Sequence, residues 1–482
     1  MQLLRKILFY VFVSIYIVFC PMLLLYAFGY ILNPAAKGGV VETGLIYVST
    51  APPGAAVYLK NSRFKEKTPA VVRDLLPGKY PMRIVLDGYE AWSDDVPVEV
   101  KKATVLDDVL LIPEKRLVQR LVAGSFLDLL PVAESGFFFT AGGNGSMADM
   151  FICDYEGEKV HNIVRDDSRF REDKLLSYFK SEGSSSVVFI VRSTRGKKIL
   201  WADLGEGKHS VKEITSLFSA PPGGIKWLSS QPEVLFSLQN GFLNKIDAGN
   251  NAVYPEFIKN VKGYGLFDGR VYVLSEDNIV SKTGFDGAGA ENILDDPALG
   301  DSIFGKGGTF DIRVVSEDLM FFTGENGELL SNRLPYKFLE RGVRGVEPDS
   351  SGGLILVWLR DKIGILDVGA ETTGDVAFEK GPEIRWIYSG GRNIEQCFWV
   401  YEDSHVLFRD GSKVYLMAVR PYGAVKIDEV VTVKGRSSVY YSETTGKLYF
   451  LERSGGELQS VDIVPVKTVI KSPFPEIAPG NK

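Results

Sequence analysis

Residues 354–368 read LILVWLRDKIGILDV, two apolar runs on either side of a charged turn. Residues 234–247, VLFSLQNGFLNKID, have the same arrangement. Short runs rich in β-branched and aromatic residues, separated by Gly, Asn or Asp, are typical of antiparallel strands joined by tight turns. Both segments therefore predict pairs of neighbouring strands in an antiparallel sheet.

Apolar cores of this kind recur along the chain. Eight of them begin at Phe137, Val187, Val234, Val271, Leu319, Leu354, His405 and Leu448. The mean interval is about 44 residues, and a period of roughly 40 to 50 with several strands per repeat is typical of a β-propeller. We therefore expect an all-β fold with a propeller of seven or eight blades over residues 119–470, in which residues 119–132 help to close the ring. A series of β-sandwiches would also give many short strands, but not one sustained period.

This pattern resembles the divergent TolB-like and quinoprotein-like propellers of bacterial envelopes, although no per-blade signature such as a recurrent Trp-Asp pair is present. The resemblance implies a rigid platform that holds variable loops on one face. Residues 471–482, KSPFPEIAPGNK, follow the predicted propeller as a polar, Pro-rich tail, for which we expect disorder.

The N-terminal segment has a different character. Residues 7–32 form an uncharged run, and about 20 apolar residues suffice to span a bilayer. Because Arg5 and Lys6 precede the run and only one basic residue follows closely, the positive-inside rule places residues 1–6 in the cytoplasm and the later residues outside it. The run is longer than the apolar core of a cleaved signal peptide. We expect an uncleaved signal anchor, a single transmembrane helix in the cytoplasmic membrane.

Between the anchor and the propeller, residues 44–113 read as short strands separated by Gly and Pro, which predicts a small antiparallel β-sandwich. Six elements occur in order: Ser49, Pro52-Pro53-Gly54-Ala55, residues 57–59, Thr68-Pro69, the 76–80 segment with Pro77-Gly78, and Gly88-Tyr89. Their spacing resembles the PEGA domain, a bacterial surface module named for its Pro-Glu-Gly-Ala signature, although Pro53 replaces the Glu. We expect these residues to be structural. The resemblance implies a cell-envelope location and a binding or spacing role, and it implies no chemistry.

Composition narrows the function. The 61 acidic and 55 basic residues give a net charge of −6, which argues against nucleic acid as a partner. His161, His209 and His405 are the three histidines, and none has a second His or Cys at ligand spacing, so we expect no metal site. The sequence contains neither a G-x-S-x-G elbow nor a phosphate-binding loop. We therefore expect no cofactor and no enzymatic activity.

The acidic pairs and the cysteines give weaker indications of a functional site or a disulfide. Asp94-Asp95 and Asp107-Asp108 are adjacent carboxylates, and on a strand the two members of each pair would point to opposite faces. We therefore expect the pairs in solvated turns rather than in a catalytic site. Cys20 falls within the predicted membrane helix, and the sequence leaves open whether Cys153 and Cys397 form a disulfide.

Two similar segments supply the candidate binding residues. Residues 224–229 (GIKWLS) and 383–388 (EIRWIY) each precede a polar turn and a strand, and we interpret them as equivalent first strands of two blades. The innermost strands of a propeller line the mouth of its central channel. Trp227 and Trp386, with Lys226 and Arg385 beside them, are therefore the predicted ligand-facing residues.

Together these features predict a membrane-anchored, extracytoplasmic binding or scaffold protein of the bacterial cell envelope. Its propeller would recognise cell-wall polysaccharide or an envelope protein, and its contact with the lipid bilayer would be made through residues 7–32. Two alternatives stay open. One is a purely structural spacer, and the other is a propeller hydrolase that acts on surface glycans or peptides.

Overall fold

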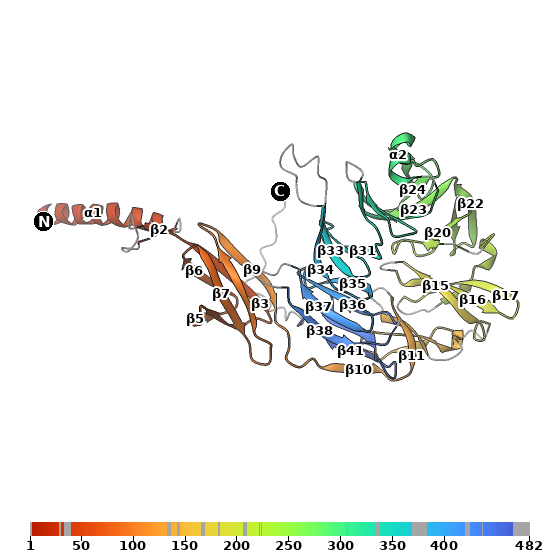
Figure 1. Ribbon diagram of the computed structural model, residues 1–482, viewed down its shortest axis with the longest axis horizontal. Coiled ribbons are helices and arrows are strands. Elements are labelled where there is room, and N and C mark those ends of the chain that lie inside the picture. The colour runs from red at the N-terminus through yellow and green to blue at the C-terminus, as the bar shows by residue number, and fades with distance from the viewer. Residues whose placement is uncertain are drawn as a thin grey trace.

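The computed structural model describes residues 2–27, 30–32, 40–132, 136–141, 145–164, 169–181, 184–205, 210–220, 222, 224–305, 307–332, 337–368, 383–419, 425–435 and 437–465. Figure 1 shows an N-terminal helix, a small β-sandwich and a large β-domain in a row along the longest axis of the molecule. The predicted disordered tail at 471–482 and His209 lie outside the described residues.

Helix α1 spans Gln2–Ala27. The prediction that this helix continues to Leu32 is wrong, because β1 (Tyr30–Leu32) pairs antiparallel with β2 (Val40–Glu42). Gly29 is a weak helix former, and the aromatic and β-branched residues that follow it favour extended backbone. The apolar run is therefore divided between a helix and a short strand.

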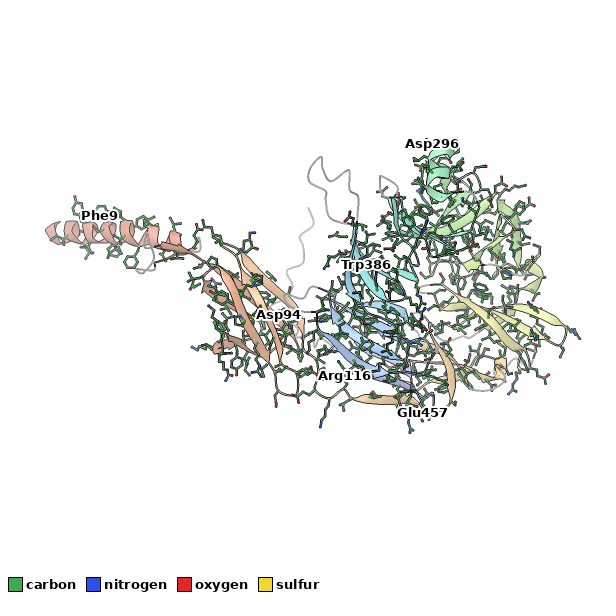
Figure 2. All side chains as sticks on the ribbon, in the orientation of Figure 1. Phe9, Asp94, Arg116, Asp296, Trp386 and Glu457 are labelled. Atoms are coloured by element: carbon green, nitrogen blue, oxygen red, sulfur yellow. The ribbon has the colours of Figure 1, made fainter. Side chains whose placement is uncertain are left out.

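The apolar side chains of α1 are largely exposed, for example Phe9 at 64% and Tyr16 at 70%. Figure 2 shows Phe9 on a helix that extends away from both β-domains. None of the helices within the described residues has the length and hydropathy needed to cross a lipid bilayer.

Two sheets form the sandwich. The first has the strand order β6-β3-β9, with β3 (Gly44–Ala51), β6 (Ala70–Leu75) and β9 (Ala103–Leu110). The second has the order β5-β4-β7-β8, with β4 (Ala56–Leu59), β5 (Ser62–Lys67), β7 (Gly78–Val85) and β8 (Trp92–Val98). Fully buried residues such as Ile46, Val57 and Val96 fill the space between them. The expectation of an entirely antiparallel sandwich is wrong at one place, because β9 returns beside β3 in parallel.

Thr68 holds the turn at Pro52–Ala55 in place. Its side-chain Oγ1 accepts a hydrogen bond from the backbone N–H of Ala55 at 2.9 Å and lies 2.6 Å from the hydroxyl of Thr50. The backbone N–H of Gly54 donates to the carbonyl of Thr68 at 2.8 Å. Gly54 has φ of +92°, a conformation that favours glycine. The Pro-Pro-Gly-Ala segment therefore forms a turn that is hydrogen-bonded to the sandwich core.

The large domain consists of eight four-stranded units within the described residues, each antiparallel, which we number as blades 1 to 8. Blade 1 comprises β11 (Phe126–Val132), β12 (Gly136–Ala141), β13 (Met150–Cys153) and β14 (Val160–Asn162). Blade 2 comprises β15 (Lys174–Lys180), β16 (Ser186–Ser193), β17 (Gly196–Asp203) and β18 (Ser210–Glu213). Blade 3 comprises β19 (Gly224–Lys226), β20 (Val234–Gln239), β21 (Phe242–Asp247) and β22 (Ala252–Ile258). Blade 4 comprises β23 (Val261–Phe267), β24 (Arg270–Ser275), β25 (Val280–Gly284) and β26 (Glu291–Leu294).

The second half of the ring repeats the same arrangement. Blade 5 comprises β27 (Phe310–Ser316), β28 (Leu319–Gly324), β29 (Leu329–Ser331) and β30 (Lys337–Glu340). Blade 6 comprises β31 (Gly345–Pro348), β32 (Leu354–Trp358), β33 (Lys362–Asp367) and β34 (Ile384–Ser389). Blade 7 comprises β35 (Ile394–Val400), β36 (His405–Asp410), β37 (Lys413–Ala418) and β38 (Ile427–Thr432). Blade 8 comprises β39 (Tyr440–Ser442), β40 (Lys447–Leu451), β41 (Leu458–Asp462) and β10 (Val118–Val122).

Blade 8 closes the ring with strands from both ends of the domain. Its outermost strand, β10, comes from the N-terminal side and pairs antiparallel with β41, so that Val118 lies opposite Val461. This pairing confirms that the segment around 119–132 helps to close the ring. Blades 4 and 5 are joined more tightly than the others, because β23 and β27 pair in parallel. A Cβ on Gly263 would lie 2.6 Å from the carbonyl oxygen of Phe310, so glycine permits this close approach.

Eight hydrophobic clusters lie between successive blades, including one between blades 8 and 1. The eight apolar cores of the sequence form the second strands, β12, β16, β20, β24, β28, β32, β36 and β40. On β28, Phe321 packs toward blade 6, whereas Phe322 packs toward blade 4. A second strand is thus buried on both faces, which explains its uninterrupted apolar sequence. The propeller prediction is confirmed, with eight blades.

Short helices occur only in connections among the described residues: α2 (Pro297–Phe304), η1 (Met147–Asp149) and η2 (Thr215–Leu217). Asp296 caps α2, because its carboxylate accepts from the backbone N–H groups of Ala298 and Leu299 at 3.0 and 3.2 Å. The helix follows blade 4 and precedes blade 5, and Phe304 at its end packs into the cluster between these two blades.

Candidate functional site

The structure places two of the predicted ligand-facing residues at the end of β19, the first strand of blade 3. Trp227, which follows the last residue of β19, is 1% exposed and donates its indole N–H to the hydroxyl of Ser184 at 2.8 Å. Lys226 forms an ion pair with Asp311 and donates to the carbonyl of Tyr264 at 2.9 Å. Trp227 is therefore a core residue, and Lys226 attaches blade 3 to blades 4 and 5.

The other two predicted residues lie elsewhere. Arg385 and Trp386 are on β34, which pairs with β33 as the fourth strand of blade 6. The interpretation of their segment as a first strand equivalent to β19 is therefore wrong. The segment returns antiparallel along β33 and completes its blade, and the next first strand is β35. The structure does not bring Trp386 together with Trp227.

Polar groups on or beside the first strands connect blade to blade around the whole ring. The connections run from Tyr178 to Asp128 (3.1 Å), Ser181 to the Trp227 carbonyl, Lys226 to the Tyr264 carbonyl, Arg313 to Glu347 (2.9 Å), Arg344 to the Ile394 carbonyl (3.0 Å), Gln396 to the Val439 carbonyl (3.3 Å) and Ser438 N–H to Asp128 (2.9 Å). The parallel pairing of β23 with β27 supplies the remaining junction. These polar side chains around the centre of the ring thus stabilise the contacts between neighbouring blades.

A cavity of about 580 Å³ lies between the sandwich and blades 6 and 7. Ligand pockets usually have volumes of about 300 to 1,000 Å³ and often lie between domains. The sandwich contributes residues of β8 and β9, and the propeller contributes the turn before β32, the turn before β36 and parts of β37 and β38. Figure 2 shows Asp94 at the side of the sandwich that faces the propeller. We call this cavity the interdomain cleft.

Carboxylates from both domains line the interdomain cleft. They include Asp94, Asp107, Asp349, Glu402, Asp403 and Asp428. The lining also includes Lys426, whose ammonium lies 3.0 Å from Glu90 and 3.6 Å from Asp428. Three of the other carboxylates accept hydrogen bonds from neutral serine hydroxyls: Asp107 from Ser49, Asp349 from Ser351 and Asp403 from Ser350. Serine partners orient these carboxylates without cancelling their negative charge.

His405 also lines the cleft. The hydroxyl of Ser404 donates to the carbonyl of Tyr401 at 2.6 Å and lies 2.8 Å from Nδ1 of His405. A hydroxyl has one proton, so Ser404 accepts from His405, and Nδ1 carries the imidazole proton. Burial lowers the pKa of His405 to about 4 and keeps the ring neutral. Nε2 is then an acceptor, and it has no partner among the described residues.

The floor and walls of the cleft include apolar groups. Val105 on β9 is 49% exposed, and Trp92, Leu354 and Leu416 contribute further apolar surface. Ala51, Leu110 and Ile112 of the sandwich are buried in the same hydrophobic cluster as residues of blades 7 and 8, and Leu110 and Ile112 also line the cleft. The two domains therefore share one core, and the cleft lies along the seam between them.

Polar contacts at the seam add to this core. Arg116 donates to the carbonyl of Glu429 at 2.6 Å, and burial lowers the pKa of its guanidinium. Tyr89, a residue of the PEGA-like pattern, forms a β-bridge with Pro113. The backbone N–H of Glu114 donates to the carbonyl of Gly88 at 3.0 Å. These contacts hold the chain that connects the sandwich to β10.

Sequence reasoning missed the cleft. The expectation that the pairs Asp94-Asp95 and Asp107-Asp108 lie in turns is wrong, because both pairs are within strands, β8 and β9. One member of each pair, Asp94 and Asp107, faces the cleft. The alternation of strand side chains could have assigned one carboxylate of each pair to a shared face, but no local signal places that face against the propeller.

The described residues contain free thiols and no metal site. Cys153 and Cys397 are both free and buried, in the cluster between blades 8 and 1 and in the cluster between blades 6 and 7, respectively. Burial raises the pKa of Cys153 to about 12 and raises that of Cys397 as well. Within the same residues, no group of three or more His, Cys, Asp or Glu side chains could hold a metal ion.

These observations define the class of protein: an eight-bladed β-propeller with a small β-sandwich packed against blades 7 and 8. The sandwich is a PEGA domain, since the family of that description matches residues 43–111. This match confirms the resemblance found in the sequence, with boundaries one or two residues from those expected. No curated protein matches the chain significantly.

Several solved structures are similar to the chain. The computationally designed Ika8 protein has 11% sequence identity and a TM-score of 0.44, covering 71% of this chain and 99% of its own. BamB from Moraxella catarrhalis has 11% identity and a TM-score of 0.42, covering 72% of this chain and 98% of its own. The Cps50 (Swd1) β-propeller domain of Myceliophteria thermophila has 13% identity and a TM-score of 0.38, covering 71% and 100%.

Proposed function

We propose that this protein is a membrane-anchored binding or scaffold protein of the bacterial cell envelope, with its N-terminus in the cytoplasm and both β-domains outside. The PEGA domain acts as a mount, and the propeller acts as a platform that recognises cell-wall polysaccharide or a protein partner. The observation that carries the proposal is the shared core, in which Ala51, Leu110 and Ile112 are buried among residues of blades 7 and 8.

The shared core supports a mounting role because it fixes the orientation of the two domains. Independent domains usually meet through small, polar interfaces and move relative to each other. Here the seam buries apolar side chains and adds the Lys426–Glu90 ion pair and the Arg116–Glu429 hydrogen bond. A rigid joint of this kind holds a platform at a set distance and angle from its point of attachment.

The sequence and the exposure of α1 support the anchor. Residues 7–32 carry no charge, and Arg5 and Lys6 lie on the side that the positive-inside rule assigns to the cytoplasm. Phe9, Phe12 and Tyr16 are each at least 64% exposed, and a surface of this kind requires lipid or protein to cover it. Insertion of α1 into lipid would cover these side chains.

Membrane fractionation tests the anchor. The full-length chain should stay in the membrane fraction after washing with high salt and with alkaline carbonate, and proteinase K added to spheroplasts should cleave both β-domains. The double variant Val13→Arg/Ile17→Arg should lose the membrane association. The matched control Val253→Arg/Tyr254→Arg adds the same charge at exposed positions on β22 and should behave as the parent. Release of the parent chain by carbonate would contradict the anchor.

Co-sedimentation tests the partner. The full-length chain in nanodiscs is mixed with insoluble cell-wall polysaccharide at moderate salt, with empty nanodiscs as the blank. Saturable binding supports a glycan partner. Absence of binding, together with a specific protein cross-link in intact membranes, supports a protein partner. Absence of both would contradict the binding role and leave a structural spacer.

A further inference from the structure

We propose that the interdomain cleft binds a basic, partly apolar peptide segment of a partner protein, with Lys or Arg side chains at the acidic rim and aliphatic side chains against the apolar floor. The inference rests on the proposed function, because it names the class of partner that such an envelope protein would hold. It also moves the binding site from the channel mouth to the seam between the domains.

The negative charge of the interdomain cleft favours a cationic ligand. Carboxylates from β8, β9, blade 6 and blade 7 converge on one cavity although they come from distant parts of the sequence. Among the described residues of the lining, Lys426 is the one lysine, and it is already engaged with Glu90 and Asp428. Asp349 and Asp403 are bonded to serine hydroxyls, which leaves their charge uncompensated by these partners. A cationic ligand complements such a site.

The hydrogen bonds of His405 independently favour a ligand that donates hydrogen bonds. Because Ser404 donates to Tyr401, Nδ1 of His405 donates to Ser404, and the free nitrogen Nε2 can only accept. The cleft therefore offers a neutral acceptor in addition to its carboxylates. A ligand with several N–H donors, such as an ammonium or guanidinium group, satisfies this acceptor, whereas an anionic ligand does not.

The apolar lining selects a peptide over an amino glycan. Val105 is 49% exposed in the cleft, and Trp92 and Leu354 add partly buried apolar surface. Burial of an aliphatic side chain against such surface is favourable by roughly 25 cal/mol per Å². A polymer of glucosamine would present hydroxyl groups to the same apolar surface, and burying a hydroxyl group there is less favourable than burying an aliphatic side chain. A volume of about 580 Å³ accommodates a few side chains rather than a folded domain.

The test is fluorescence anisotropy with a labelled pentapeptide, KLKLK, and the full-length chain in zwitterionic nanodiscs, with empty nanodiscs as the blank. The expected result is saturable binding that weakens with salt, whereas the peptides ELELE and KSKSK bind at least tenfold more weakly. The double variant Asp349→Asn/Asp403→Asn keeps side-chain size and the serine contacts but removes two charges, and it should weaken binding by about tenfold. His405→Phe removes the Nε2 acceptor and should weaken binding severalfold.

A matched control carries the same change elsewhere. Glu317→Gln/Asp318→Asn removes two exposed charges from the turn between β27 and β28, and it should leave the affinity for KLKLK unchanged. Circular dichroism of every variant establishes that the fold is intact. The proposal is overturned if the parent chain fails to bind KLKLK, if the control weakens binding as much as the cleft variant, or if chitosan pentamer binds more tightly than KLKLK with the same dependence on Asp349 and Asp403. None of these outcomes changes the result of the membrane fractionation. The proposed membrane anchor and the proposed peptide site are therefore tested independently.

Discussion

At the scale of single residues, Thr68 and His405 have hydrogen-bonding roles that could not be predicted from the sequence. Thr68 is 4% exposed, and its hydroxyl connects the turn at Pro52–Ala55 to the sandwich core. His405 begins a strand of apolar residues, but its ring faces a cavity and is held by Ser404. In both cases a polar atom inside a β-domain is oriented by a neighbouring hydroxyl.

Replacing Thr68 with Val should destabilise the PEGA domain by about 1 to 3 kcal/mol. The change keeps the shape of the side chain but leaves the buried N–H of Ala55 without its acceptor. It also removes the contact with the hydroxyl of Thr50, which still donates to the carbonyl of Pro52. Urea unfolding monitored by circular dichroism measures the effect. Ser62→Ala, at the exposed start of β5 in the same domain, should stay within about 0.5 kcal/mol. Equal effects of the two substitutions would show that the buried contact is unimportant.

His405 should make stability depend on pH. Its pKa is about 4 in the folded chain and about 6.5 when unfolded. Between these values the unfolded chain binds the extra proton, so the contribution is fully present above pH 6.5 and is lost as the pH falls toward 4. The loss is on the order of 3 kcal/mol. His405→Asn keeps a donor toward Ser404 but does not titrate, and its melting temperature should fall less between pH 7 and pH 4.5. Parallel pH profiles would refute this assignment.

At the scale of elements, the propeller could be predicted from the apolar sequences of the second strands. Each is buried on both faces between neighbouring blades, so its sequence is a continuous apolar run that recurs once per blade. First and fourth strands gave a weaker signal. They are short or partly exposed, and the similarity of GIKWLS to EIRWIY concealed that Trp227 directly follows a first strand whereas Trp386 lies on a fourth.

Closure of the ring should be sensitive to β41. Leu458 is fully buried between blades 8 and 1, on the strand that carries β10. Leu458→Ala should lower the free energy of unfolding by about 2 to 5 kcal/mol, because it leaves a cavity at the closing junction. Leu127→Ala, at a position that is 47% exposed on β11, is the matched control and should cost far less. The urea midpoint of unfolding measures both.

At the scale of the whole molecule, the shared core joins the PEGA domain and the propeller into a single structural unit. A sequence can reveal that a PEGA domain precedes a propeller, as residues 44–113 did, because each domain has its own pattern. It cannot reveal how they dock, since Leu110 and Ile112 look like any buried strand residues. The interdomain cleft escaped prediction for the same reason: its carboxylates meet only after both domains have folded and packed together.

Separating the domains should be possible with one substitution. Ile112→Asp places a charge in the core shared with blades 7 and 8, and an unpaired charge there is strongly unfavourable. Calorimetry should then resolve two unfolding transitions where the parent has one, and trypsin should cut faster in the 113–118 segment. Glu90→Gln removes only an ion pair between half-exposed side chains and should keep a single transition. A single transition in the Ile112 variant would mean that the core does not couple the domains.

The pairing of β10 with β41 also affects how the protein is made. Val118 finds its partner, Val461, only after nearly the entire chain has been synthesised. At about 5 to 20 residues per second, the ribosome needs roughly 17 to 70 seconds to reach that point. During this interval the edge of β10 has no partner in the ring and is open to pairing with another strand. A stop codon shortly before Leu458 would leave blades 1 to 7 translated but would remove β41, so β10 would have no strand to pair with and the ring would stay open.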